Sequence, residues 1–232
     1  ASLSGVLRQE GGSLTLAWGE GCGFQAEGDT QAAVLGPARK ALPASALALA
    51  AWPAGAETIL RPFLQAGLGF AFAVREGNRL TLGTDPWGLQ PLYYREGEGG
   101  VRFGDRQADL TRPGEEKLLL ASCEHFMRYF TVPTGRTLLG GVRRVPPGER
   151  VIIAPEGITS EPFPPLSGEV LPGRGETRRR LRRLLEEAVG AAADLPEGEP
   201  VGLLLSGGMD STALLAILRE VRGGPIVAIH AG

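Results

Sequence analysis

The sequence predicts an α+β protein in two parts, a β-rich sandwich up to about residue 165 and the start of a parallel α/β sheet after about residue 200. Three observations predict this: short apolar runs of alternating polarity in the first part, a Pro- and Gly-rich linker, and two continuous apolar runs around a helix in the second part. Alternation is typical of strands with one buried face, whereas continuous apolar runs are typical of strands buried on both faces.

The first part is expected to be mainly antiparallel sheet. Residues 69–75 (GFAFAVR) and 79–84 (RLTLGT) alternate in polarity, and the Gly-Asn pair at 77–78 between them predicts a tight hairpin. Segments 41–52 and 57–65 are compatible with helices. The first part therefore combines sheets with a few helices.

A clearer helix is predicted over residues 116–127. Its apolar residues fall on one face: Leu119, Leu120, Cys123 and Phe126. His125 lies in the same segment and has no Cys, Asp or second His at ligand spacing. A structural histidine is therefore expected there rather than a catalytic one.

Residues 162–175 (PFPPLSGEVLPGRG) are rich in residues that break both helices and strands. We assign residues 166–175 as a linker between a first domain, residues 1–165, and a second domain, residues 176–232. The change of pattern on either side of this stretch supports a boundary there.

The second domain begins with a predicted helix over residues 176–193. The apolar stripe of this helix is expected to be buried and comprises Leu181, Leu184, Leu185, Ala188, Val189 and Ala192. Residues 201–205 (VGLLL) and 225–230 (PIVAIH) predict buried strands, with a helix over about 209–221 between them. Strand, crossover helix and strand are the opening of a parallel sheet.

Composition excludes several classes of protein. Hydrophobic residues make up 43% and charged residues 22%, which is ordinary for a folded domain, and 24 basic against 26 acidic residues give no signal for nucleic acid or an anionic membrane. The basic run at 178–183 (RRRLRR) is followed by Glu186 and Glu187 at helix spacing, which predicts a solvated helix face. No membrane span, signal peptide or disulfide scaffold is recognised, so a cytoplasmic location is expected.

The motif that carries chemistry is Ser206-Gly207-Gly208-Met209-Asp210-Ser211, between a predicted buried strand and a helix N-terminus. Unpaired backbone N–H groups, the helix dipole, two glycines and two serine hydroxyls suit phosphate or pyrophosphate. Asp210 would repel phosphate directly, so its expected role is to hold Mg²⁺ that bridges the phosphates. The alternative is a plain glycine turn in which Asp210 or a serine caps the helix.

Three segments in chain order carry a resemblance to the asparagine synthetase family. Residues 201–216 (VGLLLSGGMDSTALLA) resemble the SGGxDS pyrophosphate loop, residues 84–94 (TDPWGLQPLYY) resemble the DRxGxKPLYY hairpin, and residues 141–153 (GVRRVPPGERVII) resemble the PPG segment. Residues 1–5 (ASLSG) fall where the family begins Cys-Gly-Ile-x-Gly. The resemblance covers nearly the whole chain.

The resemblance implies an N-terminal glutaminase-type αββα sandwich of the Ntn-hydrolase kind and then the first strand–helix–strand of an ATP-dependent, adenine nucleotide hydrolase-like domain. It implies ATP and Mg²⁺ as ligands, with adenine beside the end of the second strand. The residues it places at the nucleotide are Leu204, Ser206, Gly207, Gly208, Asp210, Ser211 and His230.

Departures from the family pattern lie mainly in the glutaminase-like domain. Ala1 stands where the family has its nucleophilic cysteine, so no catalytic residue is expected in that domain. Gly55 replaces a glutamine-binding aspartate, and Pro86 and Gln90 replace Arg and Lys of the hairpin motif. In these respects the chain is similar to β-lactam synthetases and lasso-peptide cyclases, which close a ring with an internal amine and need no ammonia.

Two classes of function follow from the sequence. The first is an amide-forming ligase that adenylates a small-molecule or peptide carboxylate for attack by ammonia or an amine, with a ring-closing synthetase as a variant. The second is an inactive accessory module. A later pyrophosphate-binding loop of the family is absent from these 232 residues. We therefore expect a further C-terminal region or a partner chain to complete the second domain, with a homodimer as one arrangement.

Overall fold

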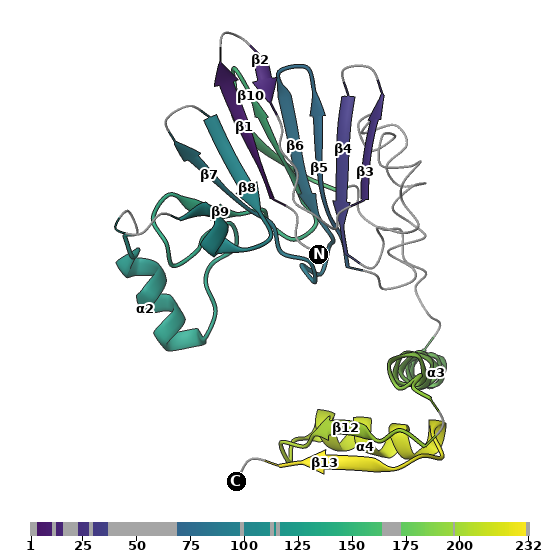
Figure 1. The fold of residues 1–232 in the computed structure, drawn as a ribbon. Helices are drawn as coiled ribbons and strands as arrows, with labels where there is room; N and C mark the ends of the chain where they lie inside the picture. The colour runs from purple at the N-terminus through teal and green to yellow at the C-terminus, as the bar shows by residue number, and fades with distance from the viewer. Residues whose placement is uncertain are drawn as a thin grey trace. The chain divides into compact units, whose positions relative to one another are not determined.

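The structure is a computed structural model that describes residues 4–10, 13–15, 23–27, 30–36, 69–97, 100–111, 114, 117–163, 173–196 and 198–230. Contacts divide the chain into two compact units, residues 1–166 and residues 167–232, which are described separately below. The first unit contains two antiparallel sheets, and the second contains two helices and a short parallel sheet (Figure 1).

One sheet of the first unit has five strands in the order β2-β1-β8-β7-β9. These strands are β1 (Ser4–Glu10), β2 (Ser13–Thr15), β7 (Tyr93–Gly97), β8 (Gly100–Gly104) and β9 (Val142–Arg144). All neighbouring pairs in it are antiparallel. The segment 84–94, which resembles the hairpin motif of the asparagine synthetase family, continues into β7 of this sheet.

The other sheet has six strands in the order β11-β10-β6-β5-β4-β3, again with antiparallel neighbours. These strands are β3 (Gly23–Glu27), β4 (Thr30–Leu35), β5 (Ala71–Glu76), β6 (Arg79–Thr84), β10 (Glu149–Ala154) and β11 (Gly157–Pro162). Glu76 pairs with Arg79, so Gly77 and Asn78 form the predicted two-residue turn, with Gly77 at a φ of 53°. The predicted hairpin is confirmed.

The two sheets face each other as layers (Figure 1) and enclose the main hydrophobic core. Alternate residues of β4, β5, β6 and β10 meet residues of β7 and β8, as the period of two requires. The cluster comprises Ala33, Leu35, Ala71, Ala73, Leu80, Leu82, Leu92, Tyr94, Val101, Phe103, Val145, Val151 and Ile153. The opposite face of the six-stranded sheet is also buried, because Phe72 and Val74 are only 1% and 2% exposed.

The helices of the first unit differ from the prediction. A short 3₁₀ helix, η2 (Gln107–Leu110), follows β8, and α2 spans Leu120–Tyr129 rather than 116–127. Leu118 instead forms a β-bridge with Leu139, so the helix begins only after this residue. The predicted helices at 41–52 and 57–65, which would supply the helical layers of an αββα sandwich, lie outside the described residues.

The apolar residues predicted to share one face of α2 are mostly exposed. Leu119, Leu120 and Phe126 are 40%, 74% and 37% exposed, Cys123 is half-buried, and Ser122 is the buried residue of the helix. The spacing of these residues correctly indicates one apolar face. No described part of the first unit covers that face, so the side chains remain accessible.

The second unit contains α3 (Arg174–Ala192), β12 (Val201–Leu204), α4 (Met209–Val221) and β13 (Ile226–Ile229). Strand β12 pairs with β13 in parallel, with Val201 opposite Ile226. The predicted strand–helix–strand is therefore observed, and α4 has the predicted bounds. A parallel pair needs a crossover connection, which α4 provides.

Burial in the second unit is much lower than the sequence predicts. The stripe residues Leu181, Leu184 and Leu185 of α3 are 55%, 50% and 37% exposed. Strand β12 alternates between half-buried and exposed residues instead of being buried on both faces, and Ile229 of β13 is 52% exposed. Two strands and the described helices cannot cover both faces of a sheet. Among the described helices, none is long and apolar enough to span a membrane.

Candidate phosphate-binding loop

The loop 206–208 connects the end of β12 to the first turn of α4. Leu205 continues the parallel ladder, because its N–H donates to the carbonyl of Ile229 at 2.8 Å. The chain then turns at Gly207, whose φ of 78° lies in the left-handed region that glycine adopts without strain. A Cβ built on Gly207 would meet nothing within 4 Å, so the loop leaves open space beside its backbone.

The two serine hydroxyls of the loop lie together. Ser206 Oγ is 3.1 Å from Ser211 Oγ and accepts the Gly208 N–H at 3.3 Å, and Ser211 Oγ donates to the Gly208 carbonyl at 3.2 Å. Thr212 Oγ1 donates to the same carbonyl at 2.8 Å. Hydroxyls from both ends of the motif therefore converge on one point.

The N-terminus of α4 adds backbone donors to the loop. The first intrahelical bond of α4 runs from the Thr212 N–H to the Gly208 carbonyl at 3.1 Å. Helix geometry then leaves the N–H groups of residues 209–211 pointing beyond the N-terminus, where the dipole is positive. Gly208 is the N-cap residue, and no side chain caps it. The alternative of a turn capped by Asp210 or a serine is therefore not what the structure shows.

Asp210 lies in the first turn of α4 and is exposed. Among the described residues, no group of three or more His, Cys, Asp or Glu side chains could enclose a metal ion. A lone carboxylate beside a phosphate site fits Mg²⁺, which keeps several waters and takes its remaining ligands from phosphate oxygens. The residues present thus fit a metal held jointly with a nucleotide.

The structure brings His230 to this loop. His230 is the first residue after β13, and its Nδ1 lies 2.8 Å from the carbonyl oxygen of Leu205, the residue before Ser206. Leu204, in contrast, is 76% exposed on the open face of β12. Of the predicted site residues, those of the motif and His230 are gathered at the carboxyl edge of the sheet, where α/β proteins bind ligands.

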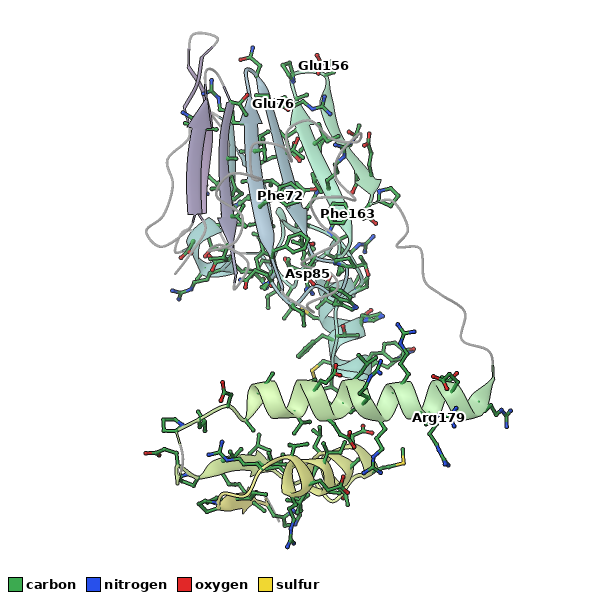
Figure 2. The ribbon with its side chains drawn as sticks, turned by 90° about the vertical axis from the view of Figure 1, so that its right-hand side faces the viewer. Phe72, Glu76, Asp85, Glu156, Phe163 and Arg179 are labelled. Atoms are coloured by element: carbon green, nitrogen blue, oxygen red, sulfur yellow. The ribbon has the colours of Figure 1, made fainter. Side chains whose placement is uncertain are left out.

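The predicted features of the glutaminase-like site are only partly visible. Ala1 and Gly55 lie outside the described residues. Pro86 and Gln90 belong to a loop that is organised by Asp85, which is completely buried near the base of the sheets and far from Glu76 and Glu156 (Figure 2). Sequence reasoning missed Asp85, although an Asp followed by Pro and a nearby Gly is a turn signal.

Asp85 accepts four backbone N–H groups with its two carboxylate oxygens. Oδ1 accepts from Trp87 at 3.0 Å and Leu89 at 3.1 Å, and Oδ2 accepts from Gln90 at 3.0 Å and Phe70 at 3.3 Å. A buried carboxylate is tolerated only when it is satisfied in this way. The aspartate of the 84–94 segment therefore has a structural role in fixing the loop.

The loop around Asp85 is hydrogen-bonded to residues 141–153, the other segment of this unit that resembles the asparagine synthetase family. Thr84 Oγ1 donates to the Pro146 carbonyl at 3.0 Å, and the Gly148 N–H donates to the Asp85 carbonyl at 3.0 Å. Arg144 donates to the Gly88 carbonyl at 3.2 Å. The two motifs, more than fifty residues apart, form one packed structure.

Two further candidates have structural explanations. His125 Nδ1 lies 2.9 Å from the Thr131 carbonyl, and its ring is 4.7 Å from that of Tyr129, as expected for a structural histidine. The run 178–183 forms ion pairs along α3 (Figure 2), among them Arg179–Glu176 at 2.6 Å, Arg182–Glu186 at 2.7 Å and Arg183–Glu187 at 3.6 Å. The predicted solvated helix face is confirmed.

Comparison with known proteins finds matches to both units. Residues 54–164 match the family model for the glutamine amidotransferase domain, and residues 180–232 match that for asparagine synthase. Asparagine synthetase [glutamine-hydrolyzing] 1 of Bacillus subtilis is 26% identical over 156 residues, which are 65% of this chain and 24% of that protein. Carboxyethyl-arginine β-lactam synthase of Streptomyces clavuligerus is 32% identical over 160 residues, 66% of this chain and 28% of that protein.

These matches confirm the resemblance to the asparagine synthetase family and the similarity to β-lactam synthetase. The chain spans about a quarter of the length of these relatives. Among solved structures, a protein described as a glutamine aminotransferase class-II domain protein from Silicibacter pomeroyi aligns with 14% identity and a TM-score of 0.40, covering 70% of this chain and 92% of that one. Glutamine phosphoribosylpyrophosphate amidotransferase from B. subtilis aligns with 15% identity and a TM-score of 0.34, covering 97% and 59%.

Proposed function

We propose that this chain contributes the nucleotide-binding loop of an ATP-dependent, amide-forming ligase of the asparagine synthetase type. The observation that carries the proposal is the loop at the carboxyl end of β12, which combines two serine hydroxyls 3.1 Å apart, the uncapped N-terminus of α4 and open space beside Gly207. This loop lies within the part of the chain that matches the asparagine synthase family. The first domain would be a glutaminase-like scaffold.

In the proposed reaction a carboxylate oxygen of the substrate attacks the α-phosphorus of ATP, and the bond between that phosphorus and pyrophosphate breaks. The nitrogen of ammonia or an amine then attacks the acyl carbon, an amide bond forms, and AMP leaves. The N–H groups of residues 209–211 and the hydroxyls of Ser206 and Ser211 stabilise the negative charge on the departing pyrophosphate. Mg²⁺, when bound, neutralises phosphate charge, and Asp210 would hold it on the loop side.

We further propose that the first domain releases no ammonia from glutamine. Ala1 carries a methyl group where the family has a thiol, and a methyl group cannot attack an amide. Gly55 offers no carboxylate for the ligand amino group. Ammonia release from glutamine by the purified chain, above a boiled control, would contradict this part of the proposal. The change Ala1→Cys alone should not create the activity.

A second candidate is a ring-closing synthetase, in which the attacking amine belongs to the same substrate molecule. The 32% identity to carboxyethyl-arginine β-lactam synthase favours it, and so does Ala1, since an internal amine needs no supply of ammonia. The two candidates differ in one measurable respect. Product formation by an ammonia-dependent enzyme rises with ammonium concentration, whereas ring closure is independent of it.

The decisive experiment is the exchange of labelled pyrophosphate into ATP by the full-length protein. We expect Asp210→Ala to lower the exchange rate at least a hundredfold while the melting temperature stays unchanged, because Asp210 is exposed and supports no core contact. The matched control is Asp194→Ala, which removes an exposed aspartate of the same unit outside the loop. Equal exchange by the Asp210→Ala variant and the parent would show that the loop is only a turn.

A further inference from the structure

Leu205, the residue that enters the phosphate loop, is held through both its N–H and its carbonyl group by Ile229 and His230. The N–H of Leu205 donates to the Ile229 carbonyl at 2.8 Å, and the carbonyl oxygen of Leu205 lies 2.8 Å from Nδ1 of His230. The first contact continues the sheet ladder, whereas the second is made by a side chain just beyond the end of β13. His230 therefore extends the sheet by one bond toward Ser206.

A carbonyl oxygen can only accept a hydrogen bond, so the contact requires a proton on Nδ1 of His230. In the neutral ring, Nε2 then carries no proton and is an acceptor. An acceptor does not bind phosphate oxygens, which are acceptors themselves. In this tautomer the contact to Leu205, rather than a contact to phosphate, is what the ring provides.

The Leu205 carbonyl and the Ser206 N–H belong to one planar peptide and point in opposite directions. A bond that fixes the carbonyl also fixes the direction of the N–H and the start of the loop that follows. Ser206 is the residue whose hydroxyl lies 3.1 Å from that of Ser211. The position of the His230 side chain is thus coupled to the pair of hydroxyls on Ser206 and Ser211.

We propose that His230 is a positioning residue for the phosphate loop, held in its Nδ1-protonated tautomer by the Leu205 carbonyl, and that it is not itself a phosphate ligand. This inference rests on the proposed function for its link to phosphate binding. The tautomer and the orientation of the Leu205–Ser206 peptide are properties of the chain without ligand. They can therefore be tested separately.

The tautomer is measured by NMR on the 232-residue chain with ¹⁵N-labelled histidine at mildly alkaline pH. The chain has two histidines, and His125 serves as an internal reference because its Nδ1 also faces a carbonyl, that of Thr131 at 2.9 Å. A His125→Gln variant assigns the two rings. We expect His230 to show a protonated Nδ1 and an unprotonated Nε2. A His230 ring protonated on Nε2, or one that averages between tautomers, would overturn the proposal.

The positioning role is tested with a graded set of variants. His230→Asn retains an N–H donor on the γ-branch, near the place of Nδ1, His230→Gln moves the donor outward, and His230→Ala removes it. We expect the amide resonances of Gly207 and Gly208 to keep their positions in His230→Asn and to shift or broaden in His230→Gln and His230→Ala. Equal spectra for the Asn and Ala variants would contradict a positioning role.

Binding of inorganic pyrophosphate with Mg²⁺, followed on the same amide resonances, links the residue to the site. Loss of one hydrogen bond that orients the loop should weaken binding about tenfold in His230→Ala and His230→Gln, with little change in His230→Asn. Equal weakening in all three variants would mean that the ring touches the ligand, against the proposal. If the parent chain keeps the tautomer and the graded amide shifts but pyrophosphate never binds, the proposed function fails while the positioning role stands.

Discussion

The two units bury their apolar residues to very different extents. In the first unit Leu80, Leu82 and Phe72 are 0%, 0% and 1% exposed. Among the described residues of the second unit, the buried hydrophobic side chains are Ala193 and Leu218, while Leu204 is 76% exposed. In both units the strands that the sequence patterns predict, and α4 of the second unit, are observed. A pattern of apolar residues therefore specifies a helix or a strand, whereas the burial of that helix or strand depends on what packs against it.

The physical reason lies in the number of layers. The first unit stacks one sheet on another, so each inward side chain meets a facing strand. In the second unit α4 packs against β12, and the residues of β12 alternate between half-buried and exposed. The apolar side chains of Leu204 and Ile229 are 76% and 52% exposed.

The largest effect is expected at the buried carboxylate of the first unit. Asp85→Ala would leave four backbone N–H groups without their acceptor, two of which belong to Trp87 and Leu89. An unsatisfied buried donor costs about 1–3 kcal/mol, and the Phe70 donor is buried while the other three are part-buried, so we expect a loss of about 3–4 kcal/mol in the free energy of unfolding. Tryptophan fluorescence during urea unfolding measures it, because all three tryptophans lie in the first unit.

Asp109→Ala is the matched control for this variant, since Asp109 is an exposed acid of the same unit. Its loss should change the free energy of unfolding by less than about 0.5 kcal/mol. Similar transitions for the two variants would mean that the four hydrogen bonds of Asp85 contribute little. The organisation of the 84–94 loop would then need another explanation.

Particular elements show how far sequence reasoning reaches. The β5–β6 hairpin and α4 follow from local pattern, because alternation and turn residues act within a few positions. The apolar stripe of α3 is predicted to be buried but is largely exposed. Spacing shows that a helix face is apolar, but not what covers it. The motif at 206–211 is predicted from its residues to form a loop between a strand and a helix N-terminus, and it does so in the structure. The contact of His230 with Leu205 could not be predicted, because it depends on strand register.

A leucine truncation in each unit tests the comparison directly. Leu82→Ala, in the core between the sheets, should cost about 3 kcal/mol through lost burial and the cavity left behind. Leu204→Ala should cost almost nothing in this chain, because most of the side chain is already in water. Tryptophan fluorescence follows the first variant, and hydrogen exchange of β12 and β13 follows the second. A large loss of protection in Leu204→Ala would show that its face is covered in solution.

A glycine-to-alanine pair probes packing rather than hydrophobicity. The Cβ added by Gly83→Ala would lie 2.3 Å from the ring of Phe72, whereas Gly202→Ala in β12 meets nothing within 4 Å. Overpacking a filled core typically costs about 1–3 kcal/mol, and alanine on an open strand is close to neutral. The same unfolding and exchange measurements apply. The double change Gly83→Ala with Phe72→Leu should recover part of the loss, and failure to do so would place the strain elsewhere.

The smallest effect is expected at the ion pairs of the second unit. Arg182 contacts Glu186 within α3 at 2.7 Å and Glu220 of α4 at 2.5 Å, and hydrogen bonds to these two carboxylates raise the pKa of its guanidinium above the ordinary value. All three groups reach solvent, so screening leaves little net stabilisation. Arg182→Ala should lower the melting temperature of the unit only slightly, yet more than Arg183→Ala, whose partner Glu187 at 3.6 Å lies on the same helix. The difference in melting temperature between the two variants, measured by circular dichroism, should disappear as salt is added, because screening weakens the ion pair between the helices. A difference that persists in high salt would mean that the aliphatic part of Arg182, rather than its charge, holds α3 to α4.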